Sequence, residues 1–181
     1  MKKFALFLTL SLLLSTVTAL AQPAGKKWEF GLSFSYTNYK FSGSSETNYL
    51  LNIPIRAGYF IWKGLEIEPE FTLTKFKGSD TGYIFSTNFS YNFKTNSSLR
   101  PYVLVGIGFG NGVPLANLVE GDSEVKAMVI NAGAGIKYLI GNSGALRLEY
   151  RYTHDRLSYS DVSEKDNLNL HQLLMGISLF F

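Results

Sequence analysis

Three glutamates spaced two residues apart are the first feature of the sequence that could carry chemistry. Glu66, Glu68 and Glu70 alternate with apolar residues in the segment LEIEPEFTLTKF. A spacing of two places all three side chains on one face of a β-strand. Carboxylates held close together can raise one another's pKa and act as a general acid or base. Such chemistry needs a cleft that admits a substrate, and the sequence indicates none.

The two histidines are a second candidate, because imidazole is a common base and metal ligand. A final hairpin that pairs Leu157 with Leu168 would place His154 directly opposite His171, with both rings facing outward. Two histidines could also bind a metal ion, but no further pattern of ligands supports such a site. The sequence therefore predicts no metal site and no bound cofactor.

Alternation of polar and apolar residues predicts the elements that position these side chains. It marks eight β-strands, over residues 28–36, 51–61, 65–76, 83–93, 103–110, 128–140, 146–152 and 172–181. Tight turns at 62–64, 95–98 and 141–144 alternate with longer polar connections near 42–48, 77–82, 111–124 and 159–167. We expect bulges at Pro54 and Pro69, since neither has an N–H to donate. The prediction is one all-β domain, an antiparallel up-and-down barrel of eight strands.

Side-chain size indicates which face of the sheet is inside. The polar face is rich in glycine and serine, which a narrow eight-stranded interior requires and a water-facing sheet does not. The apolar face carries aromatic residues toward both ends, which is typical of a membrane barrel. Those near the tight turns are Trp28, Trp62, Phe93, Tyr138 and Phe181, with Tyr102 facing inward; those near the long connections are Tyr36, Tyr39, Tyr49, Tyr83, Phe85, Tyr150 and Tyr152. A transmembrane barrel is thus favoured over a secreted soluble carrier.

Nine charged residues fall on the face assigned to the interior. They are Glu29, Arg56, Glu66, Glu68, Glu70, Lys137, Arg147, Glu149 and Arg151. Buried charges require partners, so we predict an interior ion-pair network that fills the bore. The alternative is a small-solute pore in which the same network acts as a gate.

The N-terminal segment predicts export. Lys2 and Lys3 precede an apolar run that ends in Ala19-Leu20-Ala21, which is typical of a signal peptide cleaved after Ala21. The domains are therefore a signal peptide over 1–21 and a barrel over 22–181. Without the two leader lysines, the 17 basic and 14 acidic residues become 15 and 14, and this balance gives no reason to expect nucleic acid as a partner. The absence of cysteine fits an exported chain without disulfides.

The chain resembles the small eight-stranded outer-membrane β-barrel family, the group around the OmpA transmembrane domain and OmpX. The most specific local match is the C-terminal strand, where Gly176, Leu179 and Phe181 fit the family's assembly signal, although Leu174 stands at a usually polar position. The resemblance implies a Gram-negative outer membrane, contact with its lipids and lipopolysaccharide, and recognition by the outer-membrane insertion machinery.

A partial resemblance to lipid A deacylases concerns the histidine region. Those enzymes are eight-stranded barrels with a histidine, a serine and an acid on the outer surface. Asp155 and Ser158 lie near His154, but the family's His-x-Ser motif would require serine where this chain has Arg156. We predict no catalytic residues, so the expected function is a non-enzymatic, monomeric barrel with a structural or surface-interaction role. A lipid A-modifying hydrolase and a small-solute pore remain the alternatives.

Overall fold

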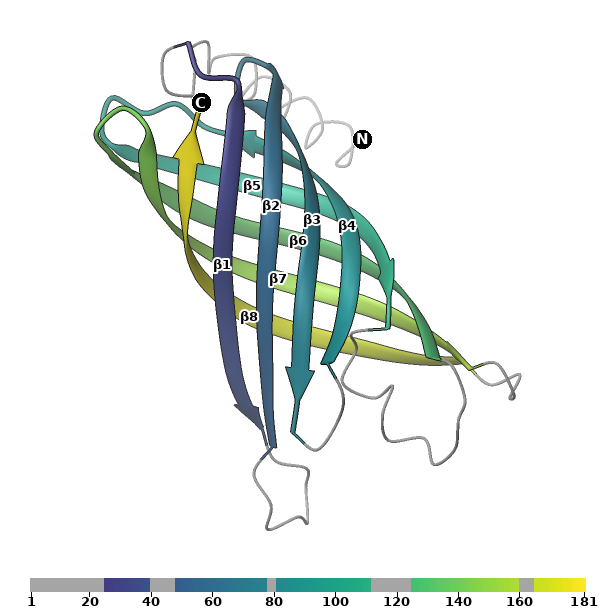
Figure 1. Ribbon diagram of the computed structural model, residues 1–181. Helices are drawn as coiled ribbons and strands as arrows, with labels where there is room; N and C mark the ends of the chain where they lie inside the picture. The colour runs from purple at the N-terminus through teal and green to yellow at the C-terminus, as the bar shows by residue number, and fades with distance from the viewer. Residues whose placement is uncertain (1–24, 40–47, 78–80, 112–124, 160–164) are drawn as a thin grey trace, which may run out of the picture.

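The computed structural model describes residues 25–39, 48–77, 81–111, 125–159 and 165–181, and eight β-strands occupy almost all of them (Figure 1). No helix in these ranges is long and apolar enough to cross a membrane. The predicted signal peptide lies outside the described residues. The strands are β1 Trp28–Tyr39, β2 Asn48–Trp62, β3 Leu65–Phe76, β4 Thr81–Asn92, β5 Leu99–Gly110, β6 Val125–Ile140, β7 Gly144–Tyr159 and β8 Lys165–Phe180.

The sheet closes on itself. Each strand pairs antiparallel with the next, and β8 returns to pair with β1, which confirms the predicted eight-stranded barrel. The chain end takes part, because the Phe181 N–H donates to the Trp28 carbonyl at 2.9 Å and its carbonyl accepts the N–H groups of Lys27 and Trp28 at 2.9 and 3.1 Å. Closure leaves no unpaired sheet edge, a requirement for strands that span lipid.

The strands are staggered around the barrel, and the stagger decides which side chains meet inside. A path along paired residues from Gly31 in β1 ends at Leu168 in β8, ten residues before Ser178, the residue that Gly31 meets directly. Strands with such a stagger must tilt, as Figure 1 shows. The path runs through Gly31, Arg56, Glu70, Ser86, Gly108, Val129, Asp155 and Leu168.

Successive residues face alternately lipid and bore, as the alternation predicts. In β3 every even-numbered residue from Glu66 to Phe76 is buried, and every odd-numbered one is partly or fully exposed. Large apolar side chains such as Phe30, Val105 and Leu173 are half exposed or more on the outer face. This arrangement puts apolar groups toward lipid and polar groups inside, the reverse of a soluble barrel.

Aromatic side chains gather near both ends of the outer face. At the end with the tight turns and the C-terminus, the rings of Trp28 and Tyr59 lie 4.8 Å apart, and those of Phe30 and Phe181 lie 5.8 Å apart. Toward the opposite end, Tyr36 stacks on Tyr49 at 6.1 Å. The side chain of Tyr39 is outside the description. These two belts correspond to the interfacial girdles of membrane barrels.

The bulges expected at Pro54 and Pro69 are wrong. Pro54 pairs with Thr72 in β3 and Pro69 pairs with Thr87 in β4, both in unbroken register. Toward the other neighbouring strand of each proline, two residue pairs are missing from the ladder, and the pairing then continues in the same register. The missing N–H therefore removes ladder bonds on one side only, and no residue is inserted. The irregularity that the register does show lies between Phe60 and Trp62, at the tight turn.

The last two strands extend furthest beyond their predicted limits. Residues 146–152 and 172–181 were predicted for the last two strands, whereas β7 spans Gly144–Tyr159 and β8 spans Lys165–Phe180. The added residues on the outer face, such as His154, Arg156 and Asn169, are polar, so the lipid-face alternation that predicts a strand is missing there. Tyr150 and Tyr152 consequently lie near the middle of β7 rather than at its end. The predicted tight turns hold, with Gly64 and Gly141 at φ values of 86° and 61° that favour glycine.

Inward side chains change in character along the barrel. At the tight-turn end Phe60, Ala145 and Phe180 pack together against Leu139. Charged side chains follow, and beyond them neutral polar ones. Near the long connections the buried residues are again apolar, so the described part of the bore is filled, as expected for eight strands. This second apolar group consists of Leu50, Phe76, Ala127, Val129 and Leu157.

Candidate functional site

All nine charged residues singled out above point into the bore. None of them is more than 4% exposed. They come from β1, β2, β3, β6 and β7, which the stagger of the sheet brings together across the interior. Ion pairs connect every one of them to at least one other, in two groups that share Arg147.

The group nearer the tight turns is organised around Lys137. Its Nζ lies 2.6 Å from Glu29 Oε2 and 3.1 Å from Glu66 Oε2. The second Glu29 oxygen lies 3.4 Å from Arg147 Nη1, which also lies 3.0 Å from Glu68 Oε2. Glu29 in β1 and Glu68 in β3 therefore contact the same guanidinium, that of Arg147 in β7. These contacts connect the three strands across the bore.

The group nearer the long connections consists of two arginines and two glutamates. Arg56 Nε lies 2.6 Å from Glu70 Oε2, and its Nη1 lies 3.0 Å from Glu149 Oε2. Arg151 contacts the same two carboxylates, with 2.6 Å from Nη1 to Glu70 Oε1 and 2.6 Å from Nη2 to Glu149 Oε1. Each carboxylate is thus held between two guanidinium groups, which suits bidentate pairing.

Tyr102 joins the two groups, and sequence reasoning assigned it no role. Its hydroxyl donates to Glu149 Oε2 at 2.6 Å and accepts from Arg147 Nε at 2.8 Å. Its ring lies 4.5 Å from Arg147 Cζ and 5.2 Å from Lys137 Nζ. The available signal was its parity, since the alternation turned this aromatic residue inward.

Glycine provides the space for these large side chains. A Cβ on Gly135 would lie 2.6 Å from the Tyr102 hydroxyl and 2.4 Å from the Leu148 carbonyl. A Cβ on Gly58 would lie 1.9 Å from Glu66 Oε1. The glycines on the inner face therefore leave room for the network, which explains their place in strands that they otherwise weaken.

Asp155 is a further buried acid that the sequence analysis did not assign to the bore. It is 2% exposed and faces inward in the part of β7 that the alternation missed. Among the buried side chains of the described residues, six carboxylates therefore accompany four basic groups. Every glutamate in this set has an ion-pair partner, whereas Asp155 forms no ion pair with the described residues. One oxygen of Asp155 also has no hydrogen-bond partner, as is true of one oxygen each of Glu66 and Glu68.

The two histidines do not lie opposite each other, which corrects the predicted hairpin. Tyr152 pairs with His171 and His154 pairs with Asn169, because Leu157 lies opposite Asp166 rather than Leu168. The Tyr150 hydroxyl lies 2.6 Å from His171 Nδ1, and His154 Nδ1 lies 2.8 Å from Asn169 Oδ1. The register of this hairpin thus differs by two residues from the predicted one.

The acid and the serine near His154 are not arranged for catalysis. Asp155 faces the bore while His154 faces outward, so the sheet separates the two side chains. Ser158 lies on the outer face but four residues along the strand, which is about 13 Å. A base must lie within hydrogen-bond reach of its nucleophile and be oriented by a third group. The described residues also contain no group of three or more His, Cys, Asp or Glu side chains that could hold a metal ion.

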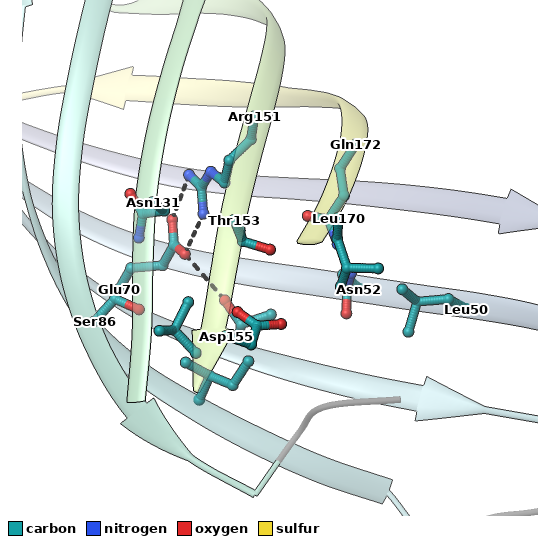
Figure 2. A pocket seen from close by; sticks show the side chains of 13 residues that line it. Leu50, Asn52, Glu70, Ser86, Asn131, Arg151, Thr153, Asp155, Leu170 and Gln172 are labelled. Carbon is teal, nitrogen blue, oxygen red and sulfur yellow. Dashed lines mark hydrogen bonds and ion pairs between the residues drawn. The ribbon is translucent and has the colours of Figure 1, made fainter. Parts of the chain in front are cut away.

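A small cavity lies inside the barrel beyond the charged network, toward the long connections (Figure 2). It measures about 30 Å³. The ion pair of Glu70 and Arg151 bounds it on one side, and polar side chains of β6, β7 and β8 line much of the rest. Asn131, Thr153 and Asp155 are among these, and each has a buried oxygen without a hydrogen-bond partner.

Solved structures with the same fold are outer-membrane and designed barrels. Neisserial surface protein A matches with a TM-score of 0.61 and 18% identity, covering 85% of this chain and 96% of that one. The N-terminal barrel domain of OprF from Pseudomonas aeruginosa matches with a TM-score of 0.54 and 19% identity, over 86% and 98%. A designed transmembrane barrel also gives 0.54, with 14% identity over 86% and 96%. At these identities the likeness concerns the fold.

Comparison at the level of sequence identifies the family. No curated protein matches the chain. The family model for the outer membrane protein β-barrel domain matches residues 7–181, which include the whole predicted mature chain. The protein thus belongs to the outer membrane protein β-barrel domain family.

Proposed function

We propose that this outer-membrane barrel of a Gram-negative bacterium is a non-enzymatic protein that acts through its outer surface and the segments beyond its strands. The main support for this proposal is the ion-pair network, which joins five strands across the bore. Apolar side chains lie beyond it at both ends of the described interior. A bore filled in this way supports a structural or surface-interaction role over transport.

The energetics of the network favour a permanent plug over a gate. Removing one partner of a buried pair costs about 3–5 kcal/mol, because a charge is left without compensation. Opening the bore would separate several such pairs at once, since Glu70 and Glu149 are each shared between two arginines or more. A gate needs two states within a few kcal/mol of each other.

Conductance across planar bilayers tests this proposal against the pore. The purified full-length barrel is expected to give no discrete channel events. The Arg56→Met/Arg151→Met variant, which removes two cations from the bore, provides a comparison in which residual leakage can be detected. Regular unitary steps from the unmodified protein would contradict the closed bore.

The second alternative, a lipid A-modifying hydrolase, is tested by the lipid itself. His154 contacts Asn169 and His171 contacts Tyr150, so within the described residues neither imidazole has a serine or a carboxylate as its hydrogen-bond partner. Mass spectra of lipid A from cells with and without the protein should be identical. A change in acylation that His154→Gln abolishes would overturn the non-enzymatic proposal.

The C-terminal strand supports recognition by the insertion machinery. Leu179 is 49% and Phe181 60% exposed on the lipid face, and Gly176 lies where a Cβ would come within 2.2 Å of the Leu32 carbonyl. We propose that these three residues form the assembly signal. The barrel acts as a monomer in this proposal, and its partners are outer-membrane lipids and lipopolysaccharide.

A further inference from the structure

We propose that the interior cavity beside Asp155 is a binding site for a small monovalent cation such as sodium. The starting point is charge. The buried side chains of the described barrel include six carboxylates and four basic groups, so among these residues the acids outnumber the bases by two. The four bases are engaged with the five glutamates, which leaves one excess negative charge within the network and a second on Asp155, which forms no ion pair with the described residues.

Burial makes this excess costly. The Asp155 side chain is 2% exposed, and its Oδ1 has no hydrogen-bond partner. An isolated carboxylate in a low-dielectric interior is strongly unfavourable unless a positive charge compensates it. The nearest guanidinium that lines the cavity, that of Arg151, is committed to Glu70 and Glu149 at 2.6 Å each. Apart from a proton on the carboxylate itself, a cation from solution is the remaining source of compensation.

The surrounding groups have the chemistry of a hard-cation site. Asn131 Oδ1 and Thr153 Oγ1 also line the cavity, are buried, and have no partner. Figure 2 shows Thr153 and Asp155 side by side on one strand, with Asn131 on the neighbouring one. Carboxylate, amide and hydroxyl oxygens are the ligands that hard cations prefer. The amide of Gln172 and that of Asn52 line the opposite wall.

Size restricts the occupant. A volume of about 30 Å³ holds one small ion with its water, because a single water needs roughly 10–15 Å³ on this measure. One uncompensated carboxylate beside Arg151 matches a single positive charge. Calcium takes six to eight oxygens, often several carboxylates, and is the less suitable occupant.

The cavity is closed at its inner end, so it does not lead through the barrel. The Glu70–Arg151 pair closes the cavity toward the tight turns, and the rest of the network lies behind it. The ion therefore binds and does not cross. This inference is independent of the proposed surface role, because the ion-pair network closes the bore whether or not an ion is bound in the cavity.

The test is a salt titration of the full barrel in lipid nanodiscs, monitored by NMR. It is carried out at mildly alkaline pH, where protons do not compete with the cation for the Asp155 carboxylate. Sodium chloride is compared with choline chloride at equal ionic strength, since choline exceeds the cavity. Sodium is expected to shift the Asn131 side-chain amide and the Thr153 backbone amide along a saturable curve, and choline is expected to shift neither. Equal shifts in sodium chloride and choline chloride would show that the response is ionic screening alone, and they would contradict the proposed cation site.

Three variants make the test specific. Asp155→Asn is nearly isosteric and should abolish the saturable response. Thr153→Val removes an inward hydroxyl and should weaken apparent affinity about fivefold, whereas Tyr152→Phe removes an outward hydroxyl from the adjacent residue and should change nothing. An undiminished response in Asp155→Asn, or a saturable response to calcium alone, would contradict the proposal. If Asp155→Asn does not fold, the comparison of the two hydroxyl variants decides.

Discussion

At the scale of single residues, the barrel interior depends on shared contacts rather than isolated pairs. Glu149 is the clearest case, because its two oxygens contact three arginines and accept the Tyr102 hydroxyl. Its side chain is fully buried, so no solvent screens these contacts. Substitutions at this position should therefore affect the whole network.

Glu149→Gln is expected to destabilise the folded barrel by about 3–5 kcal/mol, because it leaves guanidinium charges without their counter-ion. Urea unfolding in lipid vesicles, followed by tryptophan fluorescence, measures the change. Lys63→Met at the exposed β2–β3 turn is the control and should stay within about 0.5 kcal/mol. Equal stability of the two variants would mean that the network contributes nothing to folding.

Glycine positions provide a second prediction at this scale. Gly135→Ala places a methyl group 2.6 Å from the Tyr102 hydroxyl and 2.4 Å from a backbone carbonyl that cannot move freely. The expected cost is about 1–3 kcal/mol, as for other overpacked sites. Gly144→Ala is the matched control, since its nearest contact is 3.5 Å. Comparable unfolding midpoints for Gly135→Ala and Gly144→Ala would show that the bore can accommodate an additional methyl group at position 135.

At the scale of elements, β8 has two roles that can be separated. It closes the barrel through hydrogen bonds to β1, and its last residues are proposed to be read during assembly. Phe181 takes part in both, through its backbone bonds to Lys27 and Trp28 and through a ring that is 60% exposed toward lipid. Truncation removes both contributions, whereas a side-chain substitution removes only the ring.

Phe181→Ala is expected to reduce the amount of assembled barrel in cells severalfold and to leave refolding in detergent nearly unchanged. Heat-modifiable migration of outer-membrane fractions on gels measures assembly, and the same assay on refolded protein measures intrinsic folding. Trp62→Ala, an exposed aromatic at the same end but outside β8, is the control. Normal assembly of Phe181→Ala beside a defect in Trp62→Ala would contradict the assembly-signal proposal.

At the scale of the whole molecule, stability and location follow from closure. Every strand has two neighbours, and the apolar outer face has its aromatic belts near both ends. A barrel of this kind must reach its membrane unfolded, because its lipid-facing surface cannot remain in water. We propose that the predicted N-terminal leader provides that route.

The predicted leader is testable on the whole protein. Intact mass of the protein purified from outer membranes should correspond to residues 22–181, with Gln22 at the N-terminus. Ala19→Arg/Ala21→Arg, which disrupts the small-residue cleavage site, should leave the precursor uncut and lower the yield of assembled barrel. Recovery of residues 1–21 on the unmodified, membrane-inserted protein would contradict cleavage.

The sequence by itself determined the number of strands, their antiparallel closure and the face of each side chain within the predicted strands. These follow from local chemistry, since period-two alternation is a property of each strand alone and small inward residues identify a narrow bore. Nine buried charges could be assigned to the interior for the same reason.

Only the tertiary structure decided which of those residues meet. Register is set between strands, by stagger and packing, so a local pattern cannot show that Tyr102 joins Arg147 to Glu149 or that His154 lies opposite Asn169. The extension of β7 likewise has no lipid-face alternation to reveal it, and it carries Asp155 into the cavity. The faces are local and predictable, whereas the contacts across the bore depend on how eight strands close.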